Sequence, residues 1–495
     1  MKSGKKRKNH RTSKKVGQPT VSLCMIIKNE EKFLGQCLAS VSDLVDEMII
    51  VDTGSTDRSL EIAAQFRAKI YHYTWDDDFA AARNVSLSHA ASDWILALDA
   101  DEEIDDVNKY KIRKLLRKNS AQAFFLNLRS PIPENGTGKA FVNAFPRLFR
   151  NRPEIYYESP IHEHIMFSLE RLGCQPEMTD VIVHHYGYGN EKEGKTEKLE
   201  RNLRILEKHL QKEPDSGISL FHLGETQALL KHLDEAIAAF QQALTTKNLP
   251  DYLRAITHQN LASAYLNQGK FYEMQIECEH ALRLKPELLT PRLFLGYSAY
   301  LQKNFAAAID RFSDYLNESR RQKLRSDRYF EHEPNFGFVF TCLGDCHRNL
   351  QNADLAENYY RKAIEKGSRY SGTFLNLARI LFDTRRKLEA IKFLENFREW
   401  NQENEQINQL LAQTCFQVAN ELIPVKEWNR AENYLNQART LAPEIREIYY
   451  NLAVVHIKQN KYELAAENFK RVLELRPNDE EIKRKLKLLK LKSRN

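Results

Sequence analysis

Short apolar runs alternate with amphipathic stretches over the first hundred residues. The apolar runs are VSLCMII (21–27), EMIIVD (47–52), KIYHY (69–73) and WILALD (94–99). Helical patterns separate them, at about residues 30–42, 57–66 and 79–90. Strands that alternate with helices of this length predict βαβ units and a parallel sheet buried on both faces. Ligands bind at the carboxyl ends of such strands, so functional residues are expected there.

After about residue 191 the pattern is helical only. Residues 191–212 place Leu199, Leu203, Leu206 and Leu210 on one apolar stripe, which predicts an amphipathic helix that connects two domains.

From residue 213 to 486 one helical pattern recurs. A large apolar residue followed by a small one begins each unit, at Leu223, Leu261, Leu295, Leu343, Leu377, Leu411 and Leu452. Thirteen residues later comes Ala236, Met274, Ala308, Ala356, Ala390 or Ala465, and the sixth unit fits with Ala431 if seven residues are inserted. Three of the spacings are 34 residues, the period of a helix-turn-helix array.

This pattern resembles the tetratricopeptide repeat, in which small residues lie where two helices touch and a large residue wedges beside them. The large residues here are Phe240, Phe312, Tyr360 and Phe469. About seven such repeats predict an all-α solenoid with an extended concave face, which usually holds a peptide or another protein. The alternative is an array that only dimerises the protein or supports its first domain.

Charge distinguishes the amino terminus from the rest of the chain. The formal charge is +7, and residues 1–15 hold eight Lys or Arg and no acid, so the remainder sums to 7 − 8 = −1. This composition predicts a basic disordered tail at residues 1–18, and a short basic tail is also expected at residues 487–495. The first tail is either simply solvated or makes peripheral contact with an anionic membrane; nucleic acid is not an expected partner.

The seven cysteines are scattered and odd in number, which favours a reducing compartment. No apolar run approaches the roughly 20 residues that span a bilayer. We therefore expect a cytoplasmic protein, at most peripheral to the inner face of the membrane.

Carboxylates follow two of the predicted strands. Asp52 ends EMIIVD and opens the turn VDTGSTDRS, which is neither a GxGxxG fingerprint nor a P-loop. Asp99 and Asp101 follow WILAL, two residues apart, where both can reach one hard cation that keeps open positions for diphosphate oxygens. Convergence of the three acids at one sheet edge predicts a site for a nucleotide diphosphate.

Four blocks in order carry a more specific resemblance: VSLCMIIKNEEKFLGQCLASV, IIVDTGSTDRS, WDDDFAAARN and DWILALDADEEI. They resemble family 2 glycosyltransferases of the bacterial branch close to lipopolysaccharide-core and peptide glycosyltransferases, over about residues 20–190. The resemblance implies a GT-A fold for residues 19–190, an α/β domain with a Rossmann-like, mainly parallel sheet. It also implies inverting transfer from a nucleotide diphosphate sugar, usually with Mn²⁺ or Mg²⁺.

The same resemblance suggests roles for single residues. Asp52 would bind the nucleobase, Arg83 the nucleotide, Asp99 the ribose or the metal, and Asp101 the metal, with Asn84 supporting the pocket. For Asp76 to Asp78 a helix cap is favoured over a place in the pocket. Glu102 and Glu103 are expected to start a helix.

Two later blocks, YYESPIHEHI and DVIVHHYGYGNEKEGK, resemble the acceptor side of the same branch. Inverting transfer needs a base to deprotonate the acceptor, and the first candidate is Glu163, with Glu158 second. His184 or His185 would complete the metal shell or contact phosphate, or else is a structural histidine. Lys195 and Arg201 would neutralise phosphate, or else form the polar face of the connecting helix. The acceptor region is short, so the repeats are expected to supply part of it.

The pattern as a whole predicts an inverting, metal-dependent glycosyltransferase that acts on a protein or peptide presented by the repeats. The alternative is a cell-surface glycan or lipid-linked acceptor, with the repeats as a protein-interaction or oligomerisation scaffold. A metal-dependent nucleotidyltransferase is disfavoured, because IIKNEEKF stands where a glycine- and lysine-rich triphosphate loop would be expected.

Overall fold

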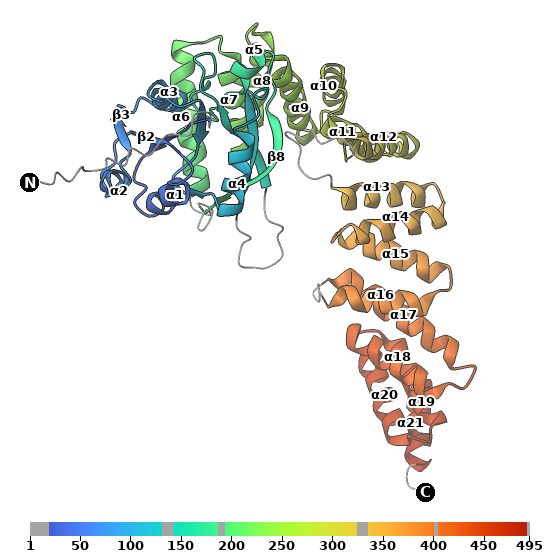
Figure 1. Cartoon of the computed structure of the whole chain (residues 1–495). Helices are drawn as coiled ribbons and strands as arrows, with labels where there is room; N and C mark the ends of the chain where they lie inside the picture. The colour runs from blue at the N-terminus through green and yellow to red at the C-terminus, as the bar shows by residue number, and fades with distance from the viewer. Residues whose placement is uncertain (1–18, 131–141, 187–193, 324–334, 400–403, 493–495) are drawn as a thin grey trace, which may run out of the picture. The chain divides into compact units, whose positions relative to one another are not determined.

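The computed structural model describes residues 19–130, 142–186, 194–323, 335–399 and 404–492 (Figure 1). The predicted basic tail at residues 1–18 lies outside them. The chain divides into two compact units, Met1–Phe294 with Glu318–Glu331, and Leu295–Asn317 with His332–Asn495. The first unit holds a sheet domain and the first helices of the array, and the second holds the later helices. The helices Leu289–Leu301 and Phe305–Lys323 are divided between the two units.

An eight-stranded sheet forms the amino-terminal domain, in the order β3-β2-β1-β4-β7-β6-β8-β5. The strands are β1 (Val21–Ile27), β2 (Glu47–Asp52), β3 (Lys69–His72), β4 (Trp94–Ala97), β5 (Glu102–Glu103), β6 (Ala123–Arg129), β7 (Val142–Arg150) and β8 (Glu177–His185). Strands β1 to β4 pair in parallel, as their alternation with helices predicts. The other half is mixed, because β7 runs antiparallel to both β4 and β6.

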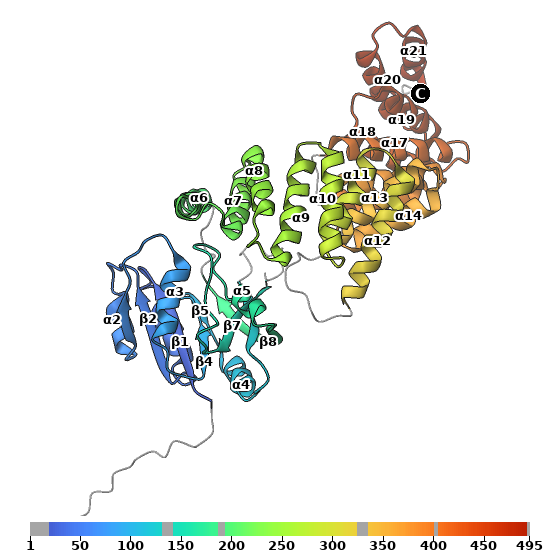
Figure 2. The same ribbon diagram turned by 90° about the horizontal axis from the view of Figure 1, so that it is seen from above.

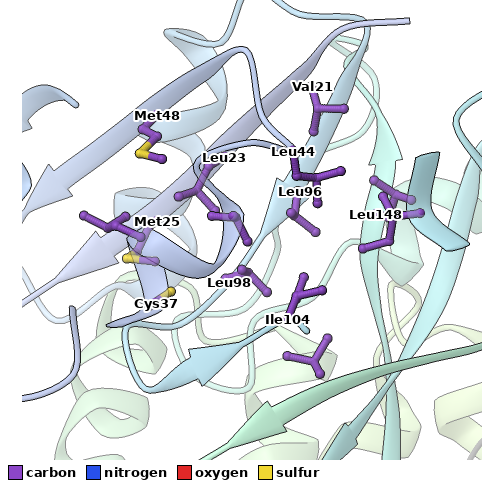
Figure 3. Packing of buried hydrophobic residues seen from close by; sticks show 14 of the residues in the cluster. Val21, Leu23, Met25, Cys37, Leu44, Met48, Leu96, Leu98, Ile104 and Leu148 are labelled. Carbon is purple, nitrogen blue, oxygen red and sulfur yellow. The ribbon is translucent and has the colours of Figure 1, made fainter. Parts of the chain in front are cut away.

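Both faces of this sheet are covered. Its helices are α1 (Leu34–Val41), α2 (Ser59–Gln65), α3 (Phe79–Ser88), α4 (Asp106–Leu115) and α5 (Met166–Arg171). One face packs a core that includes Leu23, Met25 and Leu96 against α1 and α4 (Figure 3). A second core, with Cys24 and Ile95, lies on the opposite face and includes Ala80 of α3. Strand β4 and most residues of β1 and β2 are therefore buried, which explains the hydrophobic runs in these three strands.

The prediction that Glu102 and Glu103 start a helix is wrong. They form β5, which pairs antiparallel with His185 and His184 of β8. Helix α4 begins three residues later, where the Asp105 carboxylate accepts a hydrogen bond from the Asn108 backbone N–H at 2.8 Å. Asp105 therefore caps the first turn of α4, whereas the Glu102 side chain is buried and does not cap a helix.

The connecting helix is α6 (Gly194–Lys212), and its apolar stripe packs on the sheet domain. Ile205 and Leu206 are buried together with Ile161, beside Trp75 and Phe79. On the polar side, Lys208 Nζ lies 2.5 Å from Asp77.

Helix-turn-helix pairs follow α6, in phase with the predicted repeats. Their helices are α7 (Gly217–Leu229), α8 (Leu233–Thr245), α9 (Asp251–Asn267), α10 (Phe271–Leu284), α11 (Leu289–Leu301), α12 (Phe305–Lys323), α13 (Phe336–Asn349), α14 (Ala353–Glu365), α15 (Ser371–Asp383), α16 (Lys387–Arg398), α17 (Glu405–Leu422), α18 (Trp428–Leu441), α19 (Arg446–Lys458) and α20 (Tyr462–Leu475). The last helix, α21 (Glu480–Lys492), covers residues 487–492, so the basic tail expected there is helical up to Lys492.

The small and large positions of the repeats pack as predicted. A Cβ atom added at Gly224, Gly296 or Gly344 would come within 2.4–2.6 Å of the ring of Phe240, Phe312 or Tyr360. The insertion in the sixth repeat lies around the end of α17, which ends eleven residues after Leu411, whereas α15 ends six residues after Leu377. Among the helices of the described residues, none is long and apolar enough to cross a membrane.

Candidate active site

Asp52 is the last residue of β2, and its buried carboxylate holds the turn that follows. Oδ1 accepts from the Ser55 N–H at 3.0 Å and Oδ2 from the Gly54 N–H at 3.2 Å. Gly54 has a φ of 110°, a conformation that side-chain-bearing residues rarely adopt. His72 Nδ1, at the end of β3, lies 3.4 Å from Oδ2. The carboxylate is thus fixed at the carboxyl edge of the sheet, where its predicted contact with a nucleobase would occur.

Arg83 of α3 joins two of the predicted acids. Its Nη2 donates to Asp99 Oδ1 at 2.7 Å, and its Nε donates to Glu163 Oε1 at 2.7 Å. The side chain of Arg83 is 9% exposed, so both contacts are largely shielded from water. Residues that lie 16 and 80 positions away in the sequence are therefore held by one guanidinium group.

Arg147 of β7 is a member of this site that the sequence did not identify. Its Nη2 lies 2.7 Å from Asp99 Oδ2 and 2.7 Å from Glu102 Oε1. Arg147 Nε is buried and has no hydrogen-bond partner among the described residues. The chain Glu163, Arg83, Asp99, Arg147, Glu102 alternates acid and base, and with three acids and two arginines it carries one net negative charge when all five are ionised. We call these five residues the arginine-carboxylate chain.

Within the arginine-carboxylate chain, the pKa values of Asp99 and Glu102 shift in opposite directions. Partial burial favours a raised pKa for Asp99, but the charges of Arg147 and Arg83 outweigh it and hold that pKa well below its usual range. Burial raises the pKa of Glu102, and the single contact with Arg147 does not offset it. The side chain of Glu102 is 0% exposed and also accepts from the Asp99 N–H at 2.9 Å. Glu102 therefore holds the turn after β4 and does not face solvent.

Asp101 lies opposite a histidine of β8. Its Oδ2 is 3.1 Å from His185 Nε2, whereas the neighbouring His184 Nε2 is 3.1 Å from Asp105, the residue that caps α4. Of the two histidines predicted as alternatives, His185 is the one that the structure places at the acidic turn. Burial and the nearby charges of Asp101, Asp99 and Asp57 raise the pKa of Glu30 to about 7.

The remaining predicted residues take supporting positions. Both ends of the Asn84 amide bind the backbone of Tyr157: Nδ2 donates to the carbonyl at 2.9 Å, and Oδ1 accepts from the N–H at 2.8 Å. Asn84 thus anchors the segment that leads to Glu163. Glu158, the second candidate base, forms a two-pronged ion pair with Arg171 at 2.5 and 3.2 Å.

The predicted phosphate ligands lie on α6. The guanidinium of Arg201 stacks over the Phe79 ring at 5.6 Å, on the side of α6 that packs against the sheet domain. The side chain of Lys195 lies outside the described part of the chain. Asp78 caps α3 by accepting from the Ala81 N–H at 2.9 Å, as favoured from the sequence, while Asp77 binds Lys208 of α6.

The first repeat reaches the segment that carries Glu163. The His222 ring of α7 lies 5.0 Å from the His162 ring. Burial lowers the pKa of His162 and of His164 to about 4, so both imidazoles are neutral at pH 7. Residues of α7 therefore border the predicted acceptor side of the sheet domain.

Comparison with known families identifies both parts of the chain. Residues 22–171 match the model of the glycosyl transferase family 2. Residues 218–248, 255–288 and 343–365 match one tetratricopeptide repeat model, and residues 447–479 match another. The chain thus carries a family 2 glycosyltransferase domain followed by tetratricopeptide repeats, which confirms both resemblances and the predicted fold class.

Similar proteins are described as either tetratricopeptide-repeat proteins or glycosyltransferases. A tetratricopeptide-repeat-containing protein of Synechococcus elongatus is 40% identical over 210 residues, which cover 41% of this chain and 51% of that protein. The prophage-derived glycosyltransferase SunS of Bacillus subtilis is 31% identical over 229 residues, 46% of this chain and 53% of SunS. The chain spans about half the length of these curated relatives. Among solved structures, a tetratricopeptide repeat protein of Parabacteroides merdae aligns with 55% of this chain and 98% of its own, at 19% identity and a TM-score of 0.33.

Replacing Arg147 by alanine is expected to destabilise the sheet domain by about 3 kcal/mol, because it leaves Glu102 and Asp99 without a partner they share. Native-state hydrogen exchange at the amides of β4 and β7 measures this loss. The matched control is Arg152→Ala, an exposed arginine two residues after β7, which should change the free energy of unfolding by less than about 0.5 kcal/mol. Equal effects of the two substitutions would show that the buried contacts contribute nothing.

Proposed function

We propose that this chain transfers a sugar, with inversion, from a nucleotide diphosphate sugar to a protein or peptide acceptor, with the help of a divalent metal ion. The observation that carries the proposal is the convergence of Asp52, Asp99 and Asp101 at the carboxyl edge of the parallel strands, inside the segment that matches family 2 glycosyltransferases. That edge is where open α/β sheets bind nucleotides.

Asp101 and His185 suit the metal. A carboxylate oxygen and an imidazole nitrogen that face each other at 3.1 Å form a donor pair that a cation such as Mn²⁺ accepts. Asp99 is less suited, because each of its oxygens already binds an arginine. When bound, the cation would neutralise charge on the leaving diphosphate. This assignment retains Asp101 as predicted and selects His185 over His184.

Glu163 suits the base. Arg83 fixes one carboxylate oxygen at 2.7 Å, and the side chain is 14% exposed, so its orientation is defined while it keeps access to solvent. In the proposed reaction the acceptor atom attacks the anomeric carbon, the bond from that carbon to the diphosphate breaks, and the acceptor's proton passes to Glu163. Asn84 and Arg83 would position this segment and would not touch the reacting atoms.

The acceptor would bind where the first repeat meets the sheet domain. His222 of α7 lies beside His162, the residue before the proposed base. Tetratricopeptide arrays present extended surfaces to peptides and proteins, so the array would hold the acceptor polypeptide while one of its side chains enters the site.

A thermal-shift screen of nucleotide sugars, with and without Mn²⁺, tests this function. One class of nucleotide diphosphate sugar is expected to raise the Tm of the full chain only when Mn²⁺ is present. At a ligand concentration 100 times the Kd, binding adds about 2.7 kcal/mol to the free energy of unfolding. No shift with any nucleotide sugar would contradict the proposal, and an equal shift without a divalent cation would contradict its metal dependence.

A further inference from the structure

The second repeat has polar side chains at two positions where the fourth and fifth repeats pack aromatic rings between their two helices. Three residues before and sixteen residues after the leading leucine, the fifth repeat has Phe374 and Phe393, whose rings stack at 5.4 Å. The fourth repeat has Phe340 and Tyr359, which stack at 6.1 Å. These aromatic pairs connect the first helix of each repeat to the second.

The same two positions of the second repeat hold a histidine and a glutamate. His258 of α9 and Glu277 of α10 replace the aromatic pair, and His280 lies one helical turn after Glu277. The helices α9 and α10 pack side by side (Figure 2). The contact between α9 and α10 therefore includes three side chains that can bind metal.

The potential ligand atoms of the three side chains lie close together. His258 Nδ1 lies 2.5 Å from Glu277 Oε2, and His280 Nδ1 lies 3.9 Å from the same oxygen. One potential ligand atom from each of the three residues lies within 4.8 Å of the others, and the two imidazole rings are 5.0 Å apart. The side chains of His258 and Glu277 are 15% and 16% exposed, and that of His280 is 38% exposed.

Two imidazole nitrogens and one carboxylate oxygen are a ligand set that Zn²⁺ prefers. With metal–ligand bonds of about 2.0–2.1 Å, tetrahedral ligand atoms lie roughly 3.3 Å apart, and the observed separations bracket that value. Glu277 and His280 are three residues apart on one helix, so they share a face. The more exposed position of His280 leaves an approach from solvent for the ion and for a water as fourth ligand.

We propose that His258, Glu277 and His280 bind one Zn²⁺ ion, which connects α9 to α10 in the second repeat. The ion takes the place that stacked aromatic rings have in the fourth and fifth repeats. This site is separate from Asp101 and His185 and does not depend on the proposed transfer reaction.

The experiment uses the full chain with Asp101→Ala and His185→Ala, which removes the other proposed metal pair. Zn²⁺ is titrated into this parent protein in competition with a chromophoric chelator. The parent is expected to bind one more equivalent of Zn²⁺ than a variant that adds His258→Phe and Glu277→Phe. That variant has the same residues as the Phe374 and Phe393 pair, which packs between the two helices of the fifth repeat. The helices α9 and α10 are therefore expected to stay packed. A matched control, His232→Ala, removes an exposed histidine at the start of α8 and should leave the stoichiometry unchanged.

Two further single substitutions test the ligands without adding an aromatic ring between α9 and α10. Glu277→Gln keeps a hydrogen-bond acceptor for the helix contact but removes the charged ligand, and His280→Ala removes the most exposed one. Each is expected to weaken Zn²⁺ binding at least tenfold. The proposal is overturned if the phenylalanine variant binds as many equivalents as the parent, or if Glu277→Gln and His280→Ala both keep the parent's affinity. The latter result would assign His258 and Glu277 to a hydrogen bond between helices only.

Discussion

Substitution of Asp101 by alanine is expected to lower kcat/KM for sugar transfer by at least about 1000-fold, and to remove the Mn²⁺-dependent part of the donor's thermal shift. Asp101 is a strand-end carboxylate whose Oδ2 faces the His185 imidazole at 3.1 Å, so the proposed cation loses its main anionic ligand. The side chain is 24% exposed, and its removal leaves the arginine-carboxylate chain intact. Transfer and donor hydrolysis measured at saturating Mn²⁺ check this result.

Substitutions of the adjacent residues His184 and His185 test the proposed metal site independently of Asp101. His185→Ala should weaken Mn²⁺ binding about 10- to 100-fold, because His185 is the proposed second ligand. His184→Ala should leave Mn²⁺ affinity unchanged, because His184 pairs with the cap of α4. Unaltered transfer and metal response in Asp101→Ala would refute the metal assignment. Loss of metal binding in His184→Ala and not in His185→Ala would move the site to the other face of β8.

Substitution of Glu163 by glutamine is expected to lower kcat for transfer by about 100- to 10,000-fold while donor binding persists. Glutamine keeps the oxygen that accepts from Arg83 Nε, so the loss would report the missing proton acceptor and not a collapsed site. Transfer kinetics measure the first effect, and the Mn²⁺-dependent thermal shift with the donor measures the second.

Glu158→Gln is the matched comparison for the base. Glu158 is the other glutamate of the same segment, and its carboxylate is held by Arg171. Its substitution should change kcat by less than about tenfold. If Glu158→Gln abolished transfer and Glu163→Gln did not, the two candidates would exchange roles.

The parallel half of the sheet could be predicted closely, and the mixed half could not. Apart from Ser22, Glu47 and Asp52, the runs 21–27 and 47–52 are apolar, because helices cover both faces of the sheet, and β1 and β2 have these bounds. Strand β7 is different, since Phe145 is exposed and Arg147 is buried against acids. A strand whose inward residue is an arginine lacks the alternation that periodicity detects.

The site could be predicted where one residue type implies one chemistry. Asp99 and Asp101 were recognisable by their spacing at a strand end. The sequence did not indicate that two arginines bind the Asp99 carboxylate. Arg147 lies 48 residues from Asp99, and only the pairing of β7 with β4 brings them together. The one local signal was an arginine inside PRLFR, flanked by apolar residues of a strand.

The helical half was predictable because its repeats are local. Each pair of helices is set by a small residue, a large ring and a turn within about 34 residues, so the phase could be read without knowledge of distant contacts. The same phase places His258 and Glu277 at the positions where the fourth and fifth repeats have aromatic pairs. Its meaning needed the distances between the side chains.

Because the Arg83 guanidinium binds both Asp99 and Glu163, it also limits which substitutions this protein can accept during evolution. A change at position 99 or 163 alone leaves Arg83 with half of its partners, and a change at position 83 leaves two acids without a common donor. Such interacting residues have non-additive effects, so a single substitution is costly where a concerted set is tolerated. Positions 83, 99 and 163 should therefore be inherited as one unit, although 80 residues separate the first from the last.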